Sequence, residues 1–275
     1  MQNYEKMKKD LVEAFQKKTN EKPALKNEEL KFSWSNWGFG LESLDNTAQR
    51  LENNGLKWIE LHGNLYGNDL GYKSKEVLET LDRHDIKVAG VCGMFGPEND
   101  LSSNSGISRQ NAIDYIRRQI DFCFEVGGTY MLVVPGAVGR TSAYDESEFE
   151  RSVEALQVVA DDFVQAKVRA AIEPIRSAEV SFNHTVADAK KYIESVNHAG
   201  VKHINGDVYH MQSEEVNIAQ AILDAGDQLI NLHLADSNRC ALGQGSLDVD
   251  AIIMALYLID YNDGFRFATP VRSIY

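Results

Sequence analysis

The chain has 275 residues, of which 43% are hydrophobic and 25% are charged. This composition is typical of a globular protein, and the length fits one α/β barrel or two smaller domains. The 28 Lys and Arg residues are outnumbered by 41 Asp and Glu residues, which gives a formal net charge of −13. We therefore expect no nucleic-acid partner, since binding phosphates requires a basic surface.

Cysteine use and hydropathy bear on where the protein works. The three cysteines, Cys92, Cys123 and Cys240, are far apart and lack the spacing of a metal site. We find neither a disulfide framework nor a signal peptide, and so expect a cytoplasmic location. No apolar run approaches the roughly 18 residues of a membrane span, so we expect no membrane partner.

Residues 1–29 are expected to form an N-terminal helical extension. Apolar residues recur there at helical spacing, at Tyr4, Met7, Leu11 and Phe15. Pro23 interrupts this pattern after a polar segment. We expect the helix to pack on a single domain formed by residues 30–275.

Strands and helices alternate through the rest of the chain. Eight short apolar runs predict strands, at residues 31–34, 57–61, 86–91, 130–134, 168–173, 201–206, 229–234 and 265–268. Helical periodicity separates them, and glycines such as Gly55 and Gly200 are expected to end helices, with Thr185 capping one. This alternation predicts a closed (β/α)8 barrel, a TIM barrel, rather than an open doubly wound sheet.

Three polar residues fall at the ends of successive predicted strands. Glu173 closes the fifth apolar run, because Pro174 cannot donate to a central ladder. Asp207 and His233 take equivalent places on the sixth and seventh. Strand ends of a parallel barrel converge on one face, so these side chains can share a cavity. Two carboxylates and an imidazole suit a divalent ion such as Mn²⁺, Mg²⁺, Co²⁺ or Zn²⁺.

A structural role competes with this interpretation. Taken alone, each of the three residues is better explained as a polar strand end, or for His233 as a core histidine bonded to a carbonyl. Their matching positions on three neighbouring strands favour the metal site.

Further candidates follow each of these strand ends. Glu179, His210 and Arg239 would extend the site into the loops, where a substrate would lie. Arg239 offers a fixed charge and several donors for a sugar oxygen or a carboxylate. Both Gly243 and Gly245 beside it would allow close backbone approach.

Other side chains at the barrel mouth are weaker candidates. An apolar wall for a sugar ring could be formed by Trp34, Trp37, Met94 and Phe95. Aromatic residues in such loops are more often ordinary packing. His62 could reach the cavity, although an isolated His is usually structural, and Arg140 has no partner that the sequence identifies.

These motifs resemble the xylose-isomerase-like TIM barrels. The resemblance rests on Glu173-Pro174 with Glu179, on Asp207 with His210, and on the sequence HLADSNR at 233–239 followed by Gly-Gln-Gly. It spans about residue 30 to the end and is greatest to the ketose 3-epimerases of the psicose and tagatose epimerase type, and to related sugar isomerases.

The resemblance implies a set of roles. Glu173, Asp207 and His233 would hold a divalent ion, with Mn²⁺ the first expectation, and Glu173 would be catalytic. Glu179, His210 and Arg239 would contact a sugar substrate near O1 to O3. The implied activity is a sugar isomerase or epimerase that transfers a proton next to a carbonyl, and the implied assembly is a dimer or tetramer.

One part of the family pattern is missing. The family's fourth ligand is a Glu just beyond the eighth strand, which also serves as the second base of the two-base epimerases. Residues 267–275 read FATPVRSIY and contain no acid. Either the tail is altered, or water or another group completes the site, or the barrel no longer catalyses. The alternative function is thus a non-catalytic or impaired sugar-binding barrel; an apurinic endonuclease is disfavoured by the acidic charge.

Overall fold

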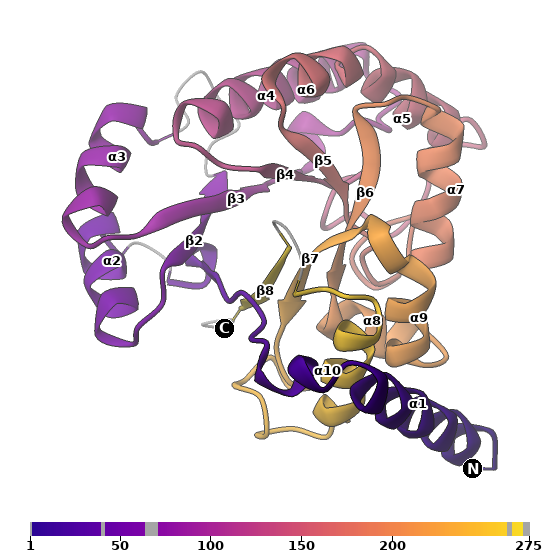
Figure 1. Ribbon diagram of the computed structural model, residues 1–275. Helices are drawn as coiled ribbons and strands as arrows, with labels where there is room; N and C mark the ends of the chain where they lie inside the picture. Colours follow the sequence, from indigo (N-terminus) through magenta and orange to yellow (C-terminus); the bar gives the residue numbers. More distant parts are fainter. Residues whose placement is uncertain (1, 40–41, 64–70, 263–265, 272–275) are drawn as a thin grey trace.

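Parallel strands, each paired with the next in sequence order, form the centre of the protein (Figure 1). A computed structural model describes residues 2–39, 42–63, 71–262 and 266–271. In these residues the sheet has eight strands: β1 Trp34–Ser35, β2 Trp58–Gly63, β3 Lys87–Gly93, β4 Tyr130–Val133, β5 Arg169–Ile172, β6 Val201–Asp207, β7 Leu229–Leu234 and β8 Phe267–Pro270. The prediction of a (β/α)8 barrel is confirmed.

The sheet closes through the segment that precedes β1. The backbone N–H of Ser33 donates to the Ala268 carbonyl at 3.2 Å, and the Ala268 N–H donates to Lys31 at 2.9 Å. Phe32 and Ala268 form a parallel bridge. Among the described residues, these contacts join β8 to the start of the barrel and nearly close it.

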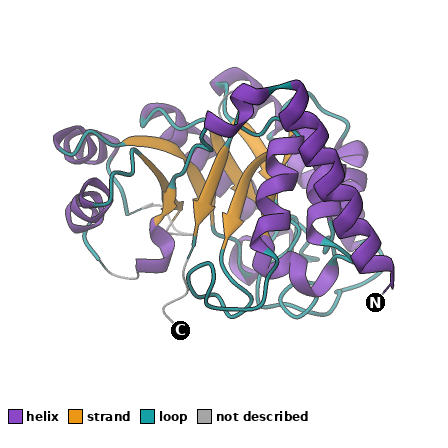
Figure 2. Cartoon of the chain, turned by 60° about the horizontal axis from the view of Figure 1, so that its bottom comes forward, coloured by secondary structure: helices purple, strands orange, loops and turns teal. Residues whose placement is uncertain are grey.

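Helices cover the outside of the strands (Figure 2). The α-helices are α1 Gln2–Glu21, α2 Leu44–Asn53, α3 Ser74–Arg83, α4 Gly106–Glu125, α5 Glu148–Gln157, α6 Ala160–Ala166, α7 Val186–Val196, α8 Val208–Glu214, α9 Ile218–Ala225 and α10 Val249–Leu258. Short 3₁₀ helices are η1 Pro23–Asn27, η2 Asn36–Phe39, η3 Pro97–Asn99 and η4 Gly226–Gln228. Among the described residues, no helix has both the length and the apolar character needed to cross a membrane.

Several predicted boundaries were wrong by a few residues. The first strand was expected at 31–34, but residues 31–33 bond to β8 and the strand shared with β2 is Trp34–Ser35. The last was expected at 265–268, yet its pairing with β7 continues to Pro270, while residue 265 lies outside the described residues. The helix capped by Thr185 ends at Val196 rather than Gly200, because Asn197 adopts a left-handed conformation with φ 48°.

Apolar side chains fill the barrel interior at the amino-terminal ends of the strands. A buried cluster separate from the main core is drawn from five strands, with the members Ala89, Tyr130, Ala171, Ile230 and Phe267. Side chains from so many strands can meet only inside the barrel, where they fill its amino-terminal half. The site at the opposite end is therefore supported from below by packed side chains.

The N-terminal helix lies against α10 (Figure 1). Tyr4 donates a hydrogen bond of 3.0 Å to the carboxylate of Asp248, which also pairs with Lys8 at 2.7 Å. Further along the helix, Lys18 reaches Asp260 at 2.7 Å. Contacts at both ends fix α1 along the outer face of the barrel.

Candidate functional site

The three residues expected at the strand ends lie together at the carboxyl end of the barrel. Glu173 directly follows β5, and its N–H still bonds to the Val133 carbonyl at 3.0 Å. Asp207 is the last residue of β6, and the sheet register places it opposite His233 of β7. All three are buried, with 6%, 2% and 2% of the residue exposed.

The Nδ1 atom of His233 lies near one oxygen of each of the two carboxylates. His233 Nδ1 lies 3.6 Å from Glu173 Oε1 and 3.9 Å from Asp207 Oδ2. Both separations exceed hydrogen-bond length. Donors that share one ion at 2.0 to 2.6 Å are themselves about 3 to 4 Å apart. The imidazole nitrogen thus lies at a suitable distance from each carboxylate for a shared divalent ion, and the three groups are ligands of a suitable chemical type.

His210 lies beside this group on α8, about one helical turn after Asp207. Its Nε2 is 3.6 Å from Asp207 Oδ2. One atom each from Glu173, Asp207 and His210 fall within 4.8 Å of one another. His210, expected as a substrate residue, is therefore close enough to be a ligand as well.

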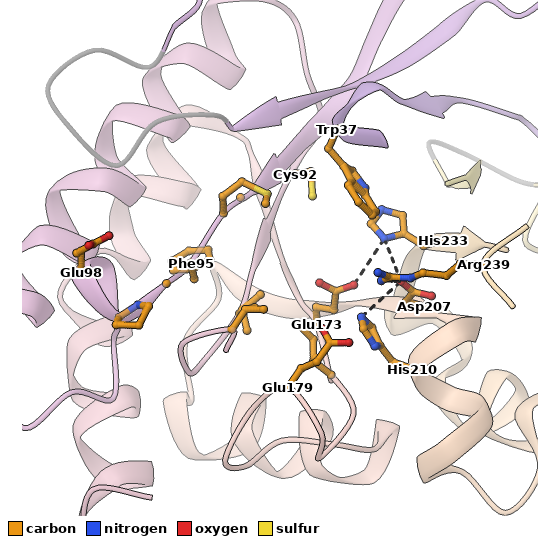
Figure 3. A pocket seen from close by; sticks show the side chains of 17 residues that line it. Trp37, Cys92, Phe95, Glu98, Glu173, Glu179, Asp207, His210, His233 and Arg239 are labelled. Atoms are coloured by element: carbon orange, nitrogen blue, oxygen red, sulfur yellow. Dashed lines mark ion pairs between the residues drawn. The ribbon is translucent and has the colours of Figure 1, made fainter. Parts of the chain in front are cut away.

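Arg239 reaches the same carboxylate from the loop after β7 (Figure 3). Its Nη2 lies 3.9 Å from Asp207 Oδ2. The guanidinium stands 4.2 Å from the centre of the Tyr209 ring and 5.5 Å from that of Trp37. These rings hold the planar group at the rim, where its donors can meet a substrate.

A cavity of about 340 Å³ opens onto these residues. Its lining residues include the charged and imidazole groups Glu98, Glu173, Glu179, Asp207, His210, His233 and Arg239, and the apolar residues Trp37, Met94, Phe95, Val134, Val138 and Ile175. Figure 3 shows Phe95 facing the charged group across the pocket. The volume lies in the range of small-molecule sites.

Not every expected residue lines this cavity. Trp34 stacks on Phe39, with ring centres 5.8 Å apart, and is not among the described lining residues. His62 is also not among them, and its N–H bonds to Asn36. Glu179 lines the cavity while its carboxylate pairs with Arg176 at 2.6 Å.

Glu60 is a site residue that sequence reasoning missed. It lies in the middle of β2, is wholly buried, and reaches His233 Nε2 at 3.0 Å. Its carboxylate also accepts hydrogen bonds from Tyr130 at 2.7 Å and Asn231 at 3.1 Å. The available signal was an acid inside the apolar run 57–61, since a buried carboxylate requires partners.

Burial and charge oppose each other in this pair. Burial alone would raise the pKa of Glu60, but the charge and hydrogen bond of His233 hold it below its ordinary value. Burial would likewise lower the pKa of His233, yet the negative charges of the neighbouring Glu60 and Glu173 raise it well above that of a free imidazole. In each residue the opposite charge of its partner thus offsets the effect of burial on the pKa.

A chain of buried amides joins Glu60 to Glu173 through the barrel interior. Asn231 donates from Nδ2 to Glu60 and, at 2.7 Å, to Asn205 Oδ1. Asn205 in turn donates to Glu173 Oε1 at 2.9 Å. Thr269 of β8 donates to Asn231 Oδ1 at 2.6 Å. A polar layer thus separates the apolar interior from the site.

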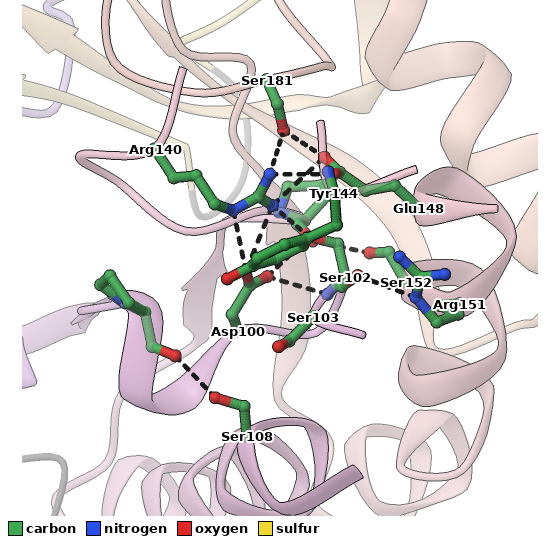
Figure 4. Close-up of polar contacts among 12 residues, drawn as sticks. Asp100, Ser102, Ser103, Ser108, Arg140, Tyr144, Glu148, Arg151, Ser152 and Ser181 are labelled. Atoms are coloured by element: carbon green, nitrogen blue, oxygen red, sulfur yellow. Dashed lines mark hydrogen bonds and ion pairs between the residues drawn. The ribbon is translucent and has the colours of Figure 1, made fainter. Parts of the chain in front are cut away.

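Arg140, for which the sequence identified no partner, forms a buried ion cluster in the loops above β3, β4 and β5 (Figure 4). Its guanidinium lies 3.2 Å from Asp100 and 2.8 Å from Glu148, whose side chains are 0% and 5% exposed. In the same loop, Val138 N–H bonds to the Phe95 carbonyl and Gly139 N–H to the Glu179 carbonyl. The cluster therefore fixes the loops that carry one cavity wall.

The segment after β8, where the family pattern has a fourth ligand Glu and this chain has none, lies mostly outside the described residues. Val271 follows β8 and bonds to the Leu234 carbonyl at 2.9 Å, and residues 272–275 are not described. Thr269 pairs with His233 in the sheet register, but its hydroxyl is already bonded to Asn231.

Comparison with known proteins gives consistent matches. A family model described as a xylose isomerase-like TIM barrel matches residues 48–270. The 3-dehydro-D-guloside 4-epimerase of Escherichia coli (strain K12) is 28% identical over 255 residues, covering 89% of this chain and 94% of that protein. The ketose 3-epimerase of Arthrobacter globiformis is 24% identical over 238 residues, covering 86% and 81%.

A solved structure agrees with these sequence matches. The apo form of 3-keto-D-glucoside 4-epimerase from E. coli matches with a TM-score of 0.77 and 25% identity, over 90% of this chain and 94% of that one. The matched part of this chain includes the strands that carry Glu173, Asp207 and His233.

Proposed function

Because this chain belongs to the xylose isomerase-like TIM-barrel family, we propose that it is a divalent-metal-dependent sugar epimerase or isomerase. The observation that carries this proposal is the convergence of Glu173, Asp207 and His233 on one buried cavity. The names of the E. coli and A. globiformis relatives, both sugar epimerases, support the reaction class.

Glu173, Asp207 and His233 would hold the ion, with Mn²⁺ the first expectation and Mg²⁺, Co²⁺ or Zn²⁺ the alternatives. When bound, the ion would polarise the sugar's carbonyl and hydroxyl oxygens and stabilise the charge that develops on them. The Glu173 carboxylate accepts the proton from the carbon next to the carbonyl. Its hydrogen bond from Asn205 keeps it oriented for this step.

The rest of the cavity would bind the sugar. His210, Arg239 and Glu179 offer donors and acceptors to its hydroxyl groups, while Phe95 and Trp37 cover apolar ring faces. Among the described lining residues, Arg239 is the one fixed positive charge. Because Arg239 already lies near Asp207, the cavity favours a neutral sugar over a phosphorylated one.

Hydrogen exchange provides the test. Ketohexoses, ketopentoses and 3-keto glycosides are incubated in D₂O with Mn²⁺ or Co²⁺, and deuterium at the carbon next to the carbonyl is followed by NMR. This measurement detects proton abstraction even where a second base is lacking. Glu173→Gln should lower exchange by at least about 100-fold.

The alternative is a sugar-binding barrel without catalysis. It was suggested by the absence of an acid after Asp263, and the epimerase names of the relatives give it no support. Retained sugar binding without deuterium exchange in any metal-loaded sample would favour the alternative and reject the enzyme proposal.

Assembly and location complete the proposal. We expect a homodimer or homotetramer in the cytoplasm, on the strength of the family resemblance. Light scattering after size-exclusion chromatography tests the assembly, and a monomer at micromolar concentration would contradict it.

A further inference from the structure

We propose that Glu60 is a positioning residue, which fixes the His233 ring so that Nδ1 is the nitrogen presented to the metal. This inference rests on the proposed function, because it concerns the same ion. Glu60 itself stands on the far side of the ring from Glu173 and Asp207.

The contacts of the two ring nitrogens carry the argument. His233 Nε2 lies 3.0 and 3.2 Å from the two carboxylate oxygens of Glu60. On the other edge, Nδ1 faces Glu173 and Asp207 at 3.6 and 3.9 Å. A neutral imidazole that donates its Nε2–H to a carboxylate has its lone pair on Nδ1. The nitrogen that faces the acids is then the one able to bind a cation.

The surroundings of Glu60 make it an acceptor. The Tyr130 hydroxyl and the Asn231 amide both donate to its Oε2. The orientation of that amide is set by Thr269, which donates to the Asn231 carbonyl oxygen. Glu60 is 0% exposed, so water has no access to compete for its oxygens. A carboxylate that receives only donors keeps the proton on His233 Nε2.

Metal titration tests this role in the full-length protein. Glu60→Gln keeps the shape of the side chain but loses its charge, and its amide can offer an N–H to Nε2. Competition of Mn²⁺ between protein and a fluorescent chelator should show about 10- to 100-fold weaker binding. Tyr130→Phe is the matched control, since it removes a hydrogen bond to the same carboxylate without touching His233. We expect Tyr130→Phe to weaken Mn²⁺ binding much less than Glu60→Gln does, because the carboxylate and its hydrogen bond from Asn231 remain.

A double-mutant cycle separates positioning from simple charge. In a His233→Ala background, Glu60→Gln should cause no further loss of Mn²⁺ affinity, because the ring through which Glu60 acts is absent. A loss of equal size in both backgrounds would overturn the proposal, since it would show a general electrostatic effect. Wild-type affinity in Glu60→Gln would overturn it as well.

A spectroscopic arm covers the case in which Glu60→Gln does not fold. In wild-type protein labelled with ¹⁵N-histidine and loaded with Zn²⁺, His233 should show a protonated Nε2 and a metal-shifted Nδ1. The His233→Ala spectrum assigns the signal. A metal-shifted Nε2 would reject the role of Glu60. Absence of any metal binding by the wild type would instead reject the proposed function, so the two failures are distinct.

Discussion

Asn205 donates a hydrogen bond of 2.9 Å from Nδ2 to Oε1 of Glu173, so a side chain of β6 orients the carboxylate that follows β5. Asn205→Ala removes this donor from a buried site. We expect kcat for the preferred sugar to fall about 10- to 100-fold, as for other groups that orient a ligand. Steady-state kinetics with saturating Mn²⁺ measures the change.

The control for Asn205 is Asn183, a second asparagine whose side chain donates to Glu173. Asn183 donates to the backbone carbonyl of Glu173 at 3.1 Å and has φ 65°, which glycine tolerates. Asn183→Gly should lower the free energy of unfolding but leave kcat largely intact. Equal losses of kcat in the two variants would show that Asn205 stabilises the surrounding structure and has no particular effect on the orientation of the Glu173 carboxylate.

Arg239 should control substrate affinity. Its guanidinium is held at the rim by Tyr209, at 4.2 Å from the ring centre. Losing one charge-assisted hydrogen bond costs about 1.5 to 3 kcal/mol, so Arg239→Met should raise KM roughly 10- to 150-fold. Arg239→Lys keeps the charge but not the planar fork, and we expect it to recover little. A KM near the wild-type value in the Lys variant would show that charge alone is sufficient.

The Arg140 cluster should contribute strongly to stability. Arg140→Met would leave the buried carboxylates of Asp100 and Glu148 without their cation. Breaking such a pair costs about 3 to 5 kcal/mol, which urea denaturation measures. Arg117→Met is the control, because its pair with Asp162 is exposed and should contribute about 1 kcal/mol or less. Similar costs for the two variants would contradict a buried, interdependent cluster.

His84 should make stability depend on pH. It caps the end of α3, with Nδ1 at 2.7 Å from Glu52 and Nε2 at 3.4 Å from Asp45. The hydrogen bond to Glu52 is the largest effect, and it raises the pKa of His84 above 6.5. Because the pKa of His84 is higher in the folded state, its protonated ring stabilises the fold. This stabilisation is present in full at pH values below the pKa of the unfolded state, and it is lost as the pH rises through the pKa of the folded state.

The corresponding measurement compares wild type with His84→Gln. The difference in their free energies of unfolding should be larger at about pH 6 than at about pH 9, because only the protonated ring pairs with the two acids. A difference independent of pH over this range would show that His84 acts by packing alone.

Most of the fold could be predicted because it depends on local pattern. Short apolar runs separated by helical periodicity predicted the alternation of strands and helices, and each strand pairs with the next. The errors fell where pairing is not local. Residues 31–33 bond to β8, at the closure of the barrel, and that partner cannot be identified from the surrounding sequence.

The convergence of three candidate residues could be predicted from the same local patterns, while their roles stay predictions. Glu173, Asp207 and His233 each follow from a strand end, and parallel register then brings them together. Glu60 and Arg140 were missed as site and cluster residues because their partners come from other strands and loops. Spacing along the chain carries no information on such contacts, although an acid inside an apolar strand indicates that a partner exists.

The contact between α1 and α10 limits when the first helix can reach its native position during folding. Asp248, the partner of Tyr4, is synthesised 244 residues later. When α1 leaves the ribosome, α10 has not yet been synthesised, so the buried side chain of Leu11 is exposed until α10 has followed. Native docking of the first helix therefore follows the synthesis of α10, so this helix is among the last elements of the fold to reach its final place.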